Sequence, residues 1–174
     1  MAGKHYKLRV AYAGFPRSLN GIHTFMAVMD ERKAKGIKDE DGSEASPLPS
    51  DMDKDEYGAK VRAKLAGQKV IPPPSGYQLF TPVIDTFLKE HLFADIFARD
   101  ILDYRSRELA TIAALASMTG TGSQLRFHLG AAMNTGLTEA QMKGFVSVLK
   151  AKVGMKEADE AAKILNEVLR TRPK

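Results

Sequence analysis

The sequence contains no cysteine and no tryptophan. Without cysteine the chain cannot form disulfides, thiolate zinc sites, iron–sulfur clusters or a cysteine nucleophile. No pair among its four histidines has a metal-ligand spacing, and no glycine-rich loop matches a phosphate cradle. We therefore expect no metal and no cofactor, so that any catalysis comes from acids, bases and fixed charges.

Long hydrophobic runs are also missing. No stretch approaches the roughly 18 apolar residues that can cross a bilayer, and the first residues, MAGKHYKLRV, lack the apolar core of a signal peptide. We expect a soluble, cytoplasmic protein that does not insert into a membrane. The net charge of +5 suggests nucleic acid, but basic residues are scattered among acidic ones at 31–40 and 51–64. Because no nucleic-acid motif accompanies them, we expect no nucleic-acid partner.

Hydrophobic periodicity predicts a helix from Pro16 to about Lys35. Its apolar stripe requires a partner surface and consists of Leu19, Ile22, Met26 and Met29. The polar, proline-containing segment 36–50 is predicted to be a linker, and a short helix is predicted over 53–65. The consecutive prolines within 70–76 indicate an extended segment before the next helices.

Five further helices are predicted to form a compact bundle, so the fold class is all-α. They cover residues 82–99, 104–118, 123–135, 139–152 and 156–170. The proposed boundary residues are Ser123 as an N-cap, Thr138 with Gln141 as a capping box, and Gly136 and Gly154 next to helix ends. The stretch 109–118 is apolar almost all round, which predicts a central buried helix.

A weak internal repeat relates the two ends of the chain. Residues 9–30 align without gaps with residues 149–170, and both copies share an Ala-x-x-Gly start. Two amphipathic helices would also produce some of this likeness by chance. We assign residues 1–35 to an N-terminal helical arm, 36–75 to a linker and 76–174 to the main helical domain.

Two polar residues fall on faces that should be buried. Glu108 begins the apolar helix above Ile112 and Leu115, and His128 shares a face with apolar residues of the next helix. Each has a structural explanation, since an acid in a first helical turn is favoured by the helix dipole and a buried histidine is usually a hydrogen-bonded core residue. The functional alternative is an acid–base pair.

Gln124 and Arg126 lie near the start of the helix that carries His128. Because helix N-termini favour negative charge, this end is a candidate site for an anionic group.

Three motifs are specific in combination: Arg-Glu-Leu at 107–109, Gln-Leu-x-x-His at 124–128 and Asn-x-Gly-Leu-Thr at 134–138. Together they make residues 98–149 resemble the carboxymuconolactone decarboxylase family, which shares its fold with the alkylhydroperoxidase AhpD group. The segment YAGFPRSLNG at 12–21 also resembles this family, but there it normally follows the core. The displaced order fits either a tandem protein with a truncated first copy or a circular permutation.

The resemblance implies an AhpD-like helical bundle in which Glu108 and His128 are the acid–base pair common to both branches. It also implies that these two side chains meet, whereas antiparallel packing alone puts the start of one helix near the end of the other. The Cys-x-x-Cys positions of the peroxidase branch fall on Thr121 and Gln124, so thiol chemistry is absent.

The activity implied is a cofactor-free decarboxylation of a small carboxylated lactone or related acid. Arg107, Gln124 and Arg126 are the candidate substrate-binding residues, because an arginine can hold a carboxylate. The alternatives are a peroxidase (peroxiredoxin-type) antioxidant activity and a non-catalytic oligomeric remnant. The resemblance further implies a homo-oligomer, either a trimer or a hexamer, in which the 16–35 helix packs on a neighbouring chain that helps to close the site.

Overall fold

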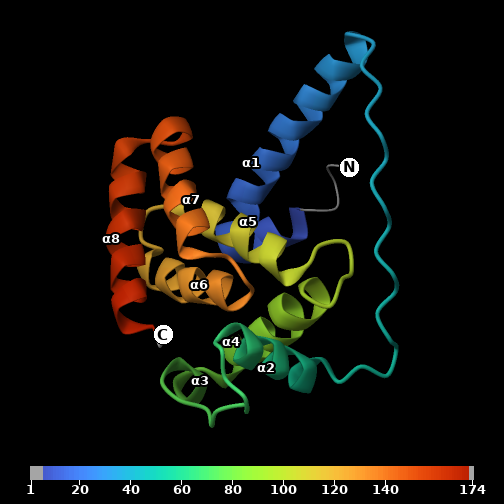
Figure 1. Ribbon diagram of the computed structural model, residues 1–174. Coiled ribbons are helices and arrows are strands. Elements are labelled where there is room, and N and C mark those ends of the chain that lie inside the picture. The colour runs from blue at the N-terminus through green and yellow to red at the C-terminus, as the bar shows by residue number, and fades with distance from the viewer. Residues whose placement is uncertain (1–5, 173–174) are drawn as a thin grey trace.

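The computed structural model describes residues 6–172, which contain helices and no strand. The prediction of an all-α, AhpD-like helical bundle with an N-terminal helical arm is confirmed (Figure 1). Among these residues, no helix is long and apolar enough to cross a membrane.

Four consecutive helices form the main bundle: α5 (Tyr104–Ala116), α6 (Gly122–Asn134), α7 (Glu139–Lys152) and α8 (Met155–Thr171). Their bounds lie within two residues of the predicted ones. Helix α5 packs against α6 and α7 packs against α8, and α8 also lies against α6. Their apolar faces enclose a first hydrophobic core, which includes Ile112, Leu115, Leu125, Leu129, Met142, Leu149, Ala161 and Leu165.

The helix starts are only partly as predicted. The capping box of Thr138 and Gln141 is present at the start of α7. The N-cap of α6 is Thr121 and not Ser123, and it makes no side-chain capping bond. The Thr121 hydroxyl instead donates to the carbonyl oxygens of Leu115, at 2.7 Å, and Met118, at 3.1 Å. It therefore ties α6 to the end of α5.

A second, smaller core lies where α2 (Lys54–Leu65) packs along η2 (Leu88–Ile96). The predicted helix 82–99 begins as α4 (Pro82–Phe87) but widens into the π-helix η2 and ends at Ile96, and the short α3 (Tyr77–Phe80) precedes it. The second core consists of Val61, Leu65, Leu92, Phe93, Ile96, Phe97 and Ala131. Gly58 permits the close approach, because a Cβ there would lie 2.1 Å from the Lys89 carbonyl oxygen.

The arm helix α1 (Tyr6–Ala34) begins ten residues earlier than predicted and is kinked at Gly14. Gly14 has φ of 73° and ψ of 163°, a left-handed conformation that glycine adopts without a steric penalty. The chain therefore turns just before Pro16, the predicted start. Figure 1 shows the result: the first segment lies beside α5, while the second segment extends away from the bundle.

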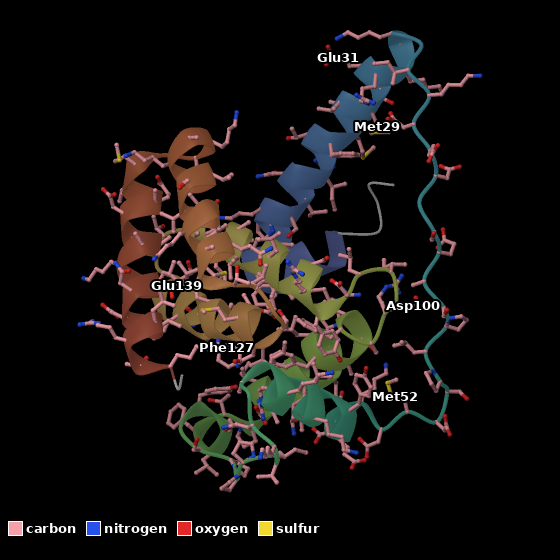
Figure 2. The ribbon with its side chains drawn as sticks, viewed as in Figure 1. Met29, Glu31, Met52, Asp100, Phe127 and Glu139 are labelled. Carbon is pink, nitrogen blue, oxygen red and sulfur yellow. The ribbon has the colours of Figure 1, made fainter. Side chains whose placement is uncertain are left out.

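The apolar stripe of the arm is not buried within this chain. Leu19 is 50% exposed and Met26 is 56% exposed, because the second segment of α1 projects beyond the bundle. Figure 2 shows Met29 and Glu31 near its outer end. That a neighbouring chain covers this stripe stays a prediction. Helix α5, whose stretch 109–118 was predicted to be a central buried helix, is buried on one face only, since Leu109 is 45% exposed.

Residues 37–49 have no regular secondary structure and run as an extended segment between α1 and α2 (Figure 1). Ser46 fastens this segment to the bundle, because its backbone N–H and hydroxyl donate to the Asp100 carboxylate at 3.0 and 2.5 Å. Figure 2 shows Asp100 on the side of the bundle that faces the segment.

Candidate active site

Glu108 and His128 form a buried hydrogen-bonded pair. His128 Nδ1 lies 2.7 Å from Glu108 Oε2, and the two residues are 4% and 0% exposed, respectively. A carboxylate at Nδ1 fixes the orientation of the imidazole ring. The other ring nitrogen, Nε2, makes no hydrogen bond among the described residues. Glu108 thus orients the His128 ring and leaves Nε2 available, as in histidines that act as a general acid or base.

Antiparallel packing of α5 and α6 is sufficient to bring Glu108 and His128 into contact. Glu108 is the fifth residue of α5 and His128 the seventh of α6. Because the two helices have equal lengths and a short connection, these positions lie at similar distances from the turn. Antiparallel packing therefore brings the side chains level with each other, and the expectation that it would separate them was wrong.

Two aromatic rings hold the imidazole ring edge-on. The ring of Tyr12, from the first segment of α1, lies 4.9 Å from that of His128 at an interplanar angle of 89°. The ring of Phe127 lies 5.0 Å away, also at 89°. Such edge-to-face contacts are favourable and restrict ring rotation. Tyr12 thus brings the displaced family-like segment directly to the acid–base pair.

Three buried oxygen atoms around the pair lack a hydrogen bond of good geometry: Tyr12 Oη, Glu108 Oε1 and Thr111 Oγ1. Unpaired buried polar groups are costly, and they are concentrated at sites that serve more than packing. Burial and then the negative charge of Glu108 raise the pKa of Tyr12 well above its usual value, although the Thr111 hydroxyl lowers it. Tyr12 therefore remains a neutral phenol beside the carboxylate.

His128 lines a cavity of about 670 Å³ between the two cores. Gln124 and Leu115 contribute to its wall from the main bundle, and Arg62 and Phe93 contribute from the second core. This volume suits a small organic ligand. The predicted catalytic residue His128 and the predicted binding residue Gln124 thus face the same space.

The other two predicted binding residues lie outside this cavity. Arg107 is buried, and its guanidinium donates to the carbonyl oxygens of Leu102, at 3.1 Å, and Arg99, at 2.5 Å. Burial and then the positive charge of Arg99 lower the pKa of Arg107. Arg126 pairs with Glu167 and lines a separate hollow. These partners hold both side chains outside the cavity beside His128, so the cavity gives no support to the binding roles predicted for them, which stay predictions.

Sequence reasoning missed Arg62 and Tyr12 as residues of the site. Arg62 lies in the range assigned to the linker, where no local pattern indicates that α2 will pack against η2. Tyr12 did carry a signal, because it begins the displaced family-like segment. Among the described residues, no cluster of His, Asp and Glu side chains could hold a metal ion.

Comparison with known proteins agrees with the motif around the pair. Residues 82–167 match the model of the carboxymuconolactone decarboxylase family, and this range contains Glu108, Gln124 and His128. The chain is also 25% identical over 122 residues to a 4-carboxymuconolactone decarboxylase of Acinetobacter baylyi (strain ATCC 33305 / BD413 / ADP1). That alignment spans 70% of this chain and 90% of the relative. The chain therefore belongs to the carboxymuconolactone decarboxylase family.

Proposed function

We propose that this protein decarboxylates a small carboxylated lactone, with His128 and Glu108 as its acid–base pair. The observation that carries the proposal is the buried hydrogen bond between them at 2.7 Å, with His128 on the wall of a ligand-sized cavity and Glu108 behind it. The relative named as a 4-carboxymuconolactone decarboxylase makes that lactone the first substrate to test.

The reaction can proceed with the residues of the chain alone. In a lactone whose carboxylate-bearing carbon is conjugated through an alkene to the lactone carbonyl, the carbon–carboxylate bond breaks and its electron pair enters a dienolate. Carbon dioxide leaves, and a proton is then added to carbon. His128 delivers this proton or donates a hydrogen bond to the developing oxyanion, while Glu108 orients the ring.

The alternative activity in this fold group is a peroxidase of the peroxiredoxin type. In that chemistry a cysteine thiolate attacks the peroxide, and the chain contains no cysteine. The third possibility, a non-catalytic remnant, predicts a protein in which the Glu108–His128 pair has only a structural role. Turnover measurements distinguish it from the decarboxylase.

The test is carbon dioxide release from 4-carboxymuconolactone by wild type, His128→Ala and His128→Gln. We expect both substitutions to lower kcat by about 100-fold or more, as for the loss of a general acid. The matched control is His91→Ala, because His91 has a 57% exposed side chain and pairs with Asp95 on the surface. Circular dichroism establishes that each variant is folded.

Activity that survives in the folded His128 variants would remove His128 from the mechanism. If the wild-type protein turns over neither this lactone nor related carboxylated lactones, the remnant interpretation replaces the decarboxylase.

A further inference from the structure

The cavity beside His128 has one permanent charge on its wall. Among the described residues that line it, Arg62 is the only side chain that is charged at all ordinary pH values. The rest of the wall is apolar, such as Leu92 and Phe93, or neutral and polar, such as Gln124 and Thr121. An anionic ligand in this cavity therefore has a single permanent cation available to it, besides His128 when its ring is protonated.

Arg62 is held in place from behind. Its Nη1 donates to the buried carboxylate of Asp85 and lies 3.4 Å from the hydroxyl oxygen of Tyr77. Asp85 also accepts a hydrogen bond from Gln78 at 3.2 Å and lies 3.5 Å from the Lys89 ammonium. The carboxylate thus has other donors besides Arg62, and it does not need the whole guanidinium group.

The rest of the Arg62 guanidinium remains available. All of its hydrogen bonds use Nη1. Nε and Nη2 have no hydrogen-bond partner among the described residues, yet neither belongs to the buried atoms that lack one. These two nitrogens are therefore accessible, on a residue that lines the cavity. Their N–H groups form the planar fork that matches the two oxygens of a carboxylate.

We propose that Arg62 is the carboxylate-binding residue of this cavity, with Asp85 as the residue that positions it. The ligand class is a small organic acid of lactone size whose carboxylate contacts Arg62 and whose body faces the apolar wall. Arg62 takes the binding role that sequence reasoning gave to Arg107 and Arg126. The inference rests on the proposed function for the assignment of the cavity as the active site.

Binding is measured with 5-oxotetrahydrofuran-2-carboxylate, a saturated lactone acid. It has no alkene through which electrons can move, so it binds without reacting. Its methyl ester has the same ring without the charge and serves as the matched ligand control. Failure of binding is therefore a separate result from failure of turnover.

Isothermal titration calorimetry of the wild-type protein should show binding of the acid in the millimolar range or tighter. Arg62→Gln should weaken it by about tenfold or more, the usual effect of losing a charge-assisted hydrogen bond. The ester should bind both proteins equally. The matched protein control is Arg126→Gln, which removes the same charge outside the cavity and should bind the acid like the wild type.

Arg62→Gln leaves Asp85 without its arginine, so two further variants separate binding from folding. Arg62→Gln/Asp85→Asn removes both charges and should lose acid binding like the single variant, whereas Arg62→Lys keeps the charge and should retain part of it. Thermal unfolding establishes that each variant is folded. The proposal is overturned if the wild type does not bind the acid, if a folded Arg62 variant binds it normally, or if Arg126→Gln weakens it equally.

Discussion

The two hydrophobic cores supply different halves of the candidate site. The core of α5 to α8 provides Glu108 and His128, whereas the core of α2 and η2 provides Arg62. Tyr12 packs against both. The acid–base pair lies within the residues that match the family model, and α2 lies before them. The Glu108–His128 pair is therefore a property of one helical hairpin, whereas the cavity exists only because a second core packs beside that hairpin.

The largest expected effect comes from separating the two helices of the second core. Gly58→Ala would place a methyl group 2.1 Å from the Lys89 carbonyl oxygen, so α2 must move away from η2. We expect a loss of about 2–3 kcal/mol in the free energy of unfolding, together with weaker acid binding. Chemical denaturation and calorimetry measure the two effects.

The control for this substitution is Gly144→Ala in α7, where an added Cβ meets nothing within 4 Å. It should raise stability by about 0.5–1 kcal/mol, because alanine favours a helix over glycine. Equal effects of the two substitutions would show that α2 tolerates the added methyl group and that the contact is not tight.

A smaller effect is expected where one residue joins both cores. Tyr12→Ala removes an aromatic ring that contacts the His128 ring and both clusters. We expect a loss of about 2 kcal/mol in stability, below the range for fully buried aromatic residues. Tyr12→Phe should cost about 1 kcal/mol or less, because the Thr111 hydroxyl is the one neighbour of the Tyr12 hydroxyl among the described residues and their contact lacks good hydrogen-bond geometry. A large loss in Tyr12→Phe, measured by thermal unfolding, would mean that the hydroxyl group has a partner in solution.

Substituting Arg107 tests whether the segment between η2 and α5, which joins the two cores, can be weakened without affecting ligand binding in the cavity. Its guanidinium binds the carbonyl oxygens of Arg99 and Leu102, which lie between η2 and α5. Arg107→Met should lower stability by about 1–2 kcal/mol, because it leaves these acceptors unpaired. Binding of the lactone acid should remain at the wild-type level. Loss of binding in a folded variant would restore Arg107 as a ligand residue.

The smallest effect concerns pH. Burial raises the pKa of Asp85, but the hydrogen bond and charge of Arg62, with help from Gln78 and Lys89, outweigh it and lower the pKa below its usual value. A lowered pKa stabilises the folded protein above the unfolded value of about 3.9, and this contribution is lost as the pH falls through the folded value.

The stability difference between wild type and Asp85→Asn should therefore be largest above about pH 4, at roughly 1 kcal/mol, and should shrink in more acidic solution. Urea denaturation at several pH values measures it. A difference that is constant across this range would show that the Arg62–Asp85 pair does not couple to protonation.

The sequence predicted the first core more accurately than the second. In the main bundle, hydrophobic period and capping agree, so the helix bounds were nearly correct and His128 was placed on a buried face. In the second core, the π-helix does not follow the 3.6-residue period of an α-helix, and the short α3 after the prolines gives no local signal. The kink at Gly14 was missed because the pattern fits a helix that simply begins after it.

The sequence by itself determined the four helices of the main bundle, the absence of cysteine chemistry and the candidate residues Glu108 and His128, because periodicity, composition and short motifs are local properties. The tertiary structure decided which arginine lines the cavity beside His128. Arg107, Arg126 and Arg62 have the same reach and charge, and the direction of each depends on partners far away in the chain or on the path of a neighbouring loop. A long side chain turns toward whichever acceptor the fold brings near it, and that acceptor cannot be read from the residues beside it.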